Sequence, residues 1–149
     1  MPSTVERVAR NTRDGANQRI RRRTAERLAH YIAHTREIPR RLRELDAEWD
    51  IERVLEANAA SVTLAGVVLA GLDRRWLALP ALVAAFLFQH AAQGWCPPLP
   101  VLRELGFRTA REIEIERVAL KLLRGDFDVD TVSGTTAENA EAAIAAATA

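Results

Sequence analysis

The chain has 149 residues, of which 48% are hydrophobic, and its 21 Lys and Arg against 20 Asp and Glu leave a net charge of +1. This length fits one ordinary domain, and the near-neutral charge with interleaved acids argues against nucleic acid as a partner. The single cysteine, Cys96, excludes an internal disulfide framework.

Residues 1–50 predict a basic, helical, cytoplasmic region. Between residues 17 and 34 one narrow helical face is apolar and the opposite face is basic. The apolar face carries Ile20, Thr24, Leu28, Tyr31 and Ile32, and the basic face carries Arg19, Arg21, Arg22, Arg23 and Arg27. Pro39 predicts the start of a second helix that continues into the apolar part of the chain. The basic face either lies on anionic lipid or is an ordinary solvated surface.

Residues 51–107 predict an integral membrane domain, a two-helix transmembrane hairpin. About 20 apolar residues are needed to cross a bilayer. Trp76–Trp95 meets this requirement, and Val54–Leu72 meets it if Glu56 lies near the headgroups. Only residues 73–75, Asp-Arg-Arg, separate the two spans, so the spans must be adjacent and antiparallel.

A buried hairpin in the core of a soluble helical protein is the alternative. Asn58, Ser61 and Thr63 favour it slightly, because they place polar groups in the first span. The other predicted helices, however, offer only narrow apolar stripes, which could not cover two helices that are apolar all round. We therefore favour a transmembrane hairpin over a buried hairpin in a soluble protein.

The arginines at the ends of the spans predict the orientation. Seven lie on the side of the two termini, namely Arg40, Arg41, Arg43, Arg53, Arg103, Arg108 and Arg111. Arg74 and Arg75 lie in the turn, so the positive-inside rule places both termini in the cytoplasm. The three tryptophans, Trp49, Trp76 and Trp95, fall near span ends, as in an aromatic belt.

Prolines 97 and 98 end the second span, a short turn is expected over residues 99–107, and a helix is expected over residues 108–126. Thr109 with Glu112 forms a capping-box pattern at its start, and Gly125 is a candidate C-cap. The last segment, 127–149, is acidic and rich in alanine, so we expect it to be disordered. The fold class is thus all-α, with amphipathic cytoplasmic helices on both sides of the hairpin.

A polar layer is expected near the cytosolic mouth of the hairpin. Asn58 lies sixteen residues before Arg74 and His90 sixteen residues after it, so the two share one depth. Gln89, Gln93 and Glu56 fall in the same layer, with Cys96 just beyond. These side chains either hydrogen-bond between the helices and fix their register or form a small polar pocket.

Cys96, between Trp95 and Pro97, is the most specific single candidate for a functional residue. A lowered pKa would make it reactive, and burial would make it inert. We expect a cytosol-accessible thiol of ordinary reactivity. One His and one Cys do not make a zinc site, so no metal or cofactor is expected.

The segment from about Ile51 to Phe107 resembles the YgaP-like inner-membrane domain, a two-helix family of unknown function often fused to rhodanese-type sulfurtransferases. The resemblance rests on the Gly94-Trp95-Cys96-Pro97 exit and the short amphipathic stretch ending at Leu105-Gly106. It implies a bacterial inner-membrane location and a dimer. The chain carries no rhodanese domain, so sulfur transfer by this chain alone is not implied.

Three functions remain open. The favoured one is a non-enzymatic anchor, scaffold or assembly partner, because the sequence shows no acid–base pair, nucleophile–base pair or phosphate loop. The second is an accessory to sulfur or thiol chemistry through Cys96, and the third is transport by an oligomer lined with the Asn58 and His90 layer. The expected partners are the lipid bilayer and either a second copy or another membrane protein.

Overall fold

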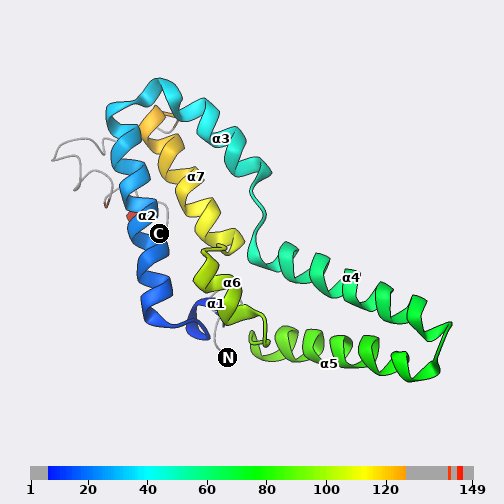
Figure 1. The fold of residues 1–149 in the computed structure, drawn as a ribbon. Coiled ribbons are helices and arrows are strands. Elements are labelled where there is room, and N and C mark those ends of the chain that lie inside the picture. Colours follow the sequence, from blue (N-terminus) through cyan, green and yellow to red (C-terminus); the bar gives the residue numbers. More distant parts are fainter. Residues whose placement is uncertain (1–6, 127–140, 142–143, 146–149) are drawn as a thin grey trace. The chain divides into compact units, whose positions relative to one another are not determined.

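The computed structural model describes residues 7–126, 141 and 144–145, and the regular secondary structure of this part is helical, with no strand. The α-helices of this part are α1 (Arg7–Arg10), α2 (Asp14–Ala33), α3 (Ile38–Ala47), α4 (Ile51–Ala70), α5 (Ala78–Gln93), α6 (Leu99–Leu105) and α7 (Ala110–Arg124). Short 3-10 helices, η2 (Thr35–Glu37) and η3 (Arg74–Leu77), precede α3 and α5 (Figure 1). The prediction of an all-α fold is confirmed for the described residues. The predicted disorder of 127–149 falls almost entirely outside the described residues.

The chain divides into two compact units. Unit 1 contains residues 1–16 and 49–107, and unit 2 contains residues 17–48 and 108–149. The basic region before the hairpin and the helix after it therefore belong mostly to the same unit.

Unit 1 is built on the antiparallel pair α4 and α5, which lie side by side in Figure 1. The Asp50 carboxylate accepts a hydrogen bond from the Arg53 N–H at 2.7 Å and caps α4. The Asp73 carboxylate accepts from the Arg75 N–H at 2.9 Å and starts η3 in the same way. The polar residues of the predicted turn thus begin the returning helix, whose first turn is 3-10.

The two helices approach closely at Gly66, which is buried. A Cβ atom there would lie 2.7 Å from Cδ of Pro80 and 3.2 Å from Cβ of Leu79. Pro80 lies in the first turn of α5, where a missing N–H leaves no intrahelical bond unmade. The backbone of α4 therefore packs directly on α5 near the turn.

The other end of the hairpin has a small apolar core of Val8, Ile51, Leu55, Cys96 and Leu99. Helix α1 holds the end of α5 there, because Arg7 donates to the Ala91 carbonyl and Asn11 Nδ2 donates to the Gln93 carbonyl at 3.1 Å. These bonds satisfy carbonyls that lack partners at a helix C-terminus. Gly94 then leaves the helix at φ +73°, a conformation that suits glycine.

Unit 2 packs α2, α3 and α7 around Leu28, Tyr31, Ile38, Leu45, Ile113, Ala119 and Leu120. The predicted capping box is confirmed, since Thr109 and Glu112 bond each other's backbone N–H groups, and Gly125 is the C-cap of α7 at φ +85°. Arg27 does not lie on an exposed basic face as expected. It points to the carboxylate of Glu116 in α7.

Two predicted segments differ from the structure. The helix expected to run from Pro39 into the first span is broken after Ala47, because Asp50 begins a new helix with its own cap. The stretch after Pro98, expected as a turn, is the short helix α6 with Gly106 at φ +94° as its C-cap.

Two helical segments are long and apolar enough to cross a membrane by length and composition. They are Thr35–Ala70, which includes α4, and Arg74–Gln93, which includes α5. Only 11% of the most apolar 18-residue stretch of the first segment is buried, and 0% of that of the second. Most of the apolar surface of the hairpin is therefore uncovered in the described part of the chain.

Candidate functional site

Three of the five predicted site residues meet at one cavity of unit 1. Asn58 of α4, His90 of α5 and Cys96 line a cavity of about 90 Å³. The rest of its lining is Leu55, Ala59, Val62, Val83, Phe86, Leu87 and Pro98. The equal spacing of Asn58 and His90 from Arg74 thus brings them to the same level of the hairpin.

Gln89 and Gln93 do not belong to this lining. Gln93 is exposed, and its backbone carbonyl receives the Asn11 amide rather than a group on α4. The predicted layer is therefore split. Gln89 and Gln93 lie at the expected depth on α5, but a side chain must also have the right angular position around the helix to face α4.

The cavity is not the polar pocket that the sequence suggested. Its wall is almost wholly apolar. Nδ1 of His90 is buried without a hydrogen-bond partner, and within residues 7–126 no side-chain hydrogen bond joins His90 to Asn58. The wall of this cavity therefore suits an apolar group better than a polar one.

The expectation of an accessible thiol at Cys96 is also wrong. Its side chain is 5% exposed and packs with Val8, Ile51, Leu55 and Leu99, so it is not an accessible thiol. Burial raises the pKa of the Cys96 thiol, although the nearby N–H of Leu99 opposes this. Burial and a raised pKa both make a thiol less nucleophilic than an exposed one. Among the described residues, no group of three or more His, Cys, Asp or Glu side chains could hold a metal ion.

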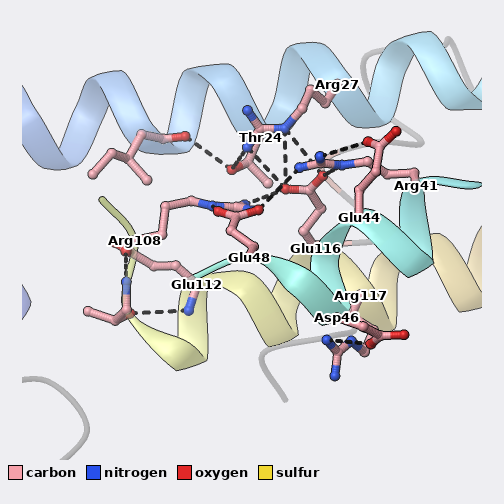
Figure 2. A network of polar contacts seen from close by, with 12 residues as sticks. Thr24, Arg27, Arg41, Glu44, Asp46, Glu48, Arg108, Glu112, Glu116 and Arg117 are labelled. Atoms are coloured by element: carbon pink, nitrogen blue, oxygen red, sulfur yellow. Dashed lines mark hydrogen bonds and ion pairs between the residues drawn. The ribbon is translucent and has the colours of Figure 1, made fainter. Parts of the chain in front are cut away.

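The most strongly built polar cluster lies instead in unit 2, around Glu116 of α7 (Figure 2). The Glu116 side chain is 0% exposed and receives guanidinium groups from three segments. Arg41 Nε donates to it at 2.9 Å, Arg27 donates at 3.0 and 3.2 Å, and Arg108 forms a further short contact. We call Arg27, Arg41, Glu48, Arg108 and Glu116 the Glu116 cluster.

Glu48 completes this cluster. Its carboxylate receives Nε and a terminal nitrogen of Arg108 at 2.8 and 2.6 Å, which is a bidentate pair. It also lies 3.6 Å from Arg41. The cluster therefore links α2, the end of α3 and the start of α7 through two carboxylates and three arginines.

The charges in the cluster support one another. Burial alone would raise the pKa of the Glu116 carboxyl, but hydrogen bonding from Arg41 and the positive charges of Arg108 and Arg27 hold it below its ordinary value. Burial would lower the pKa of Arg108, but its bonds and charge interactions with Glu48 and Glu116 raise it. The cluster therefore favours the ionised forms of Glu116, Arg108 and Arg41.

This pKa gives a testable pH dependence. A carboxyl whose pKa is lower in the folded state stabilises the fold above its unfolded value and loses that contribution as the pH falls. The free energy of unfolding of unit 2 should thus be steady near neutral pH and decrease below about pH 4.5, the ordinary value for this carboxyl. A urea titration that follows the NMR signal of Tyr31, the one tyrosine, measures this. Glu116→Gln should have a smaller acid-dependent decrease than the wild type, and equal decreases would contradict the assignment.

The Glu116 cluster was not predicted from the sequence, although one local signal is present. Glu116 lies three residues after Ile113 and four before Leu120, so it occupies the apolar stripe of α7. A charged residue in such a stripe requires buried partners. Two of its three arginine partners, Arg41 and Arg27, lie 75 and 89 positions away, which no local pattern identifies.

Comparison with known proteins adds no relative: the chain matches no family model, no curated protein and no solved structure.

Proposed function

We propose that this protein is an integral membrane protein that acts as a non-enzymatic anchor or scaffold. In this proposal α4 and α5 span the bilayer, and unit 2 is the cytoplasmic part that partners contact. The bacterial inner membrane is the proposed location, on the basis of the sequence resemblance to the YgaP-like inner-membrane domain.

The uncovered apolar surface of α4 and α5 carries the proposal. Val68 and Leu72 on one side of the turn and Phe88 on α5 are 67%, 85% and 77% exposed. A hairpin in the core of a soluble protein would have these side chains covered. Contiguous apolar surface of this kind marks a membrane or an interface, and the lengths of both segments suit a membrane.

The proposed orientation places both termini in the cytoplasm, and it rests on the arginine count. Arg74 and Arg75 are exposed at the turn, where they would lie among the headgroups of the opposite leaflet. Trp76 beside them and Trp95 at the other end are 45% and 38% exposed, which suits side chains at the two interfaces.

The other two functions receive less support. A thiol relay needs an accessible and ionised Cys96, whereas the side chain is buried and its pKa is raised. Transport through the layer of Asn58 and His90 needs a polar path, whereas the cavity there is apolar. A dimer partner remains part of the proposal through the family resemblance.

Alkaline carbonate extraction of cell membranes tests the proposal. The full chain should stay in the membrane pellet, because removing two apolar spans from lipid would expose their side chains to water. Reporter fusions test the orientation in the same cells, and fusions at either terminus should be active only for a cytoplasmic reporter. Monodisperse protein in the soluble fraction without detergent would overturn the membrane proposal, and a periplasmic signal from a terminal fusion would reverse the orientation.

A further inference from the structure

Helix α2 carries an excess of positive charge that the other helices of unit 2 do not have. Between residues 17 and 29 it has five arginines and one acid, Glu26. Helix α3 has three arginines against Glu44 and Asp46, and α7 has four basic residues against three glutamates. Positive charge is thus balanced in α3 and α7 and concentrated in α2.

The structure directs this charge away from the core of unit 2. Ile20, Thr24 and Leu28 are buried, which fixes the inward side of the helix. At 3.6 residues per turn, Arg19, Arg22 and Arg23 fall within an arc of about 100° on the other side. All three are exposed, and we call them the basic face of α2.

Glu26 is the one acid that α2 itself contributes between residues 17 and 29. Arg22 lies 3.6 Å from Glu26, and both side chains are largely exposed, so the pair is weak. Arginines on α3 and α7 have closer partners, such as Arg40 with Glu37 at 3.2 Å and Arg117 with Asp46 at 2.9 Å. Because arginines outnumber acids over residues 17–29, α2 itself contributes net positive charge on this side.

We propose that the basic face of α2 binds the anionic phospholipid headgroups of the cytoplasmic leaflet. This inference rests on the proposed function, in which the residues before the first span are cytoplasmic. Guanidinium groups match phosphate oxygens in a two-pronged geometry, and all but one of the 21 basic residues are arginine. The cytoplasmic leaflet is negatively charged and attracts basic segments near the membrane.

The mode of binding follows from the packing. The apolar side of α2 is already used, since Leu28 and Tyr31 belong to the core of unit 2. The helix cannot insert an apolar face into lipid while unit 2 stays folded. Binding is therefore electrostatic, depends on headgroup charge, and weakens as salt shortens the Debye length to about 3 Å at 1 M.

The test uses the full chain in vesicles, with a fluorophore on Gln18→Cys beside the basic face, in a Cys96→Ala background. A small fraction of the lipids carries a quencher on the headgroup, so quenching reports contact between the labelled helix and the membrane surface. Quenching should be strong in vesicles of equal phosphatidylcholine and phosphatidylglycerol, and weak in pure phosphatidylcholine or in about 1 M salt. The triple variant Arg19→Gln/Arg22→Gln/Arg23→Gln should weaken this contact. The ratio of the lipid-bound to the unbound state of the basic face should decrease on the order of 100-fold, about fivefold for each arginine.

The matched control removes the same charge elsewhere on unit 2, as Arg36→Gln/Arg43→Gln/Arg111→Gln, all exposed positions, and should retain the quenching. Equal quenching in neutral and anionic vesicles, or equal losses in both triple variants, would overturn the inference. Selective release by inorganic phosphate or by a short RNA duplex at constant ionic strength would overturn it too, assigning the face to a free anion or to nucleic acid. Carbonate-resistant retention in the vesicles is measured separately, so its loss identifies failure of the proposed function instead.

Discussion

Replacing Glu116 with alanine should destabilise unit 2 by about 3–5 kcal/mol, the loss typical when one partner of a buried ion pair is removed. The Glu116 side chain is 0% exposed and Arg108 is 4% exposed, so water cannot replace the missing carboxylate easily. Arg27, Arg41 and Arg108 would then face one another, with Glu48 as their remaining acid within the Glu116 cluster. Mutual repulsion and desolvation act in the same direction.

The measurement is urea unfolding of the full chain in detergent micelles at neutral pH, followed by the NMR signal of Tyr31 in the core of unit 2. Glu114→Ala is the matched control, because Glu114 is on the same helix, is 54% exposed and pairs with Arg117 at the surface. Its effect should be at most about 1 kcal/mol. Similar losses for the two variants would show that the Glu116 cluster does not stabilise the fold.

A compensated variant separates charge from packing. If all five residues of the Glu116 cluster, including Glu48, are replaced by methionine, no uncompensated charge remains in the cluster, and apolar side chains of similar length fill the space. Replacement of a buried ion pair by apolar groups is often neutral or stabilising. Most of the stability lost in Glu116→Ala should therefore return. A variant as unstable as Glu116→Ala would mean that shape rather than unpaired charge causes the loss.

The sequence predicted those features of the fold that depend on local patterns. Two long apolar runs with an Asp-Arg-Arg connection predicted the adjacent antiparallel helices, and equal distances from Arg74 predicted that Asn58 and His90 share a level. The capping pattern of Thr109 and Glu112 predicted the start of α7. Each of these signals lies within a few residues or depends only on counting along a hairpin.

Features that depend on long-range packing could not be predicted in this way. Cys96 is buried because Val8, from the start of the chain, and Leu55 of α4 cover it, and the two prolines that follow it give no sign of this. Glu116 is buried among arginines from α2 and α3 because unit 2 joins segments on both sides of the hairpin. Helical periodicity could suggest that Glu116 faces inward, but not which of the many arginines would meet it.

The hairpin of unit 1 should be most sensitive to substitution at Gly66. A leucine there would place its Cβ 2.7 Å from Pro80 and its further atoms inside α5. Overpacking of this kind typically costs about 1–3 kcal/mol, and here the contact atoms belong to a proline ring and to a Cβ, which cannot rotate away. We expect Gly66→Leu to separate α4 from α5 or to unfold the pair.

Disulfide formation between Asn58→Cys and His90→Cys, in a Cys96→Ala background, measures the separation, because residues 58 and 90 line one cavity. The pair should oxidise readily with glycine at position 66 and much more slowly with leucine. Ala65→Leu is the matched control, since Ala65 is exposed and adjacent, and it should leave the rate unchanged. Thermal unfolding in micelles gives an independent readout, in which Gly66→Leu alone should have a lower midpoint. Equal rates and midpoints for both variants would show that α4 and α5 do not meet at Gly66.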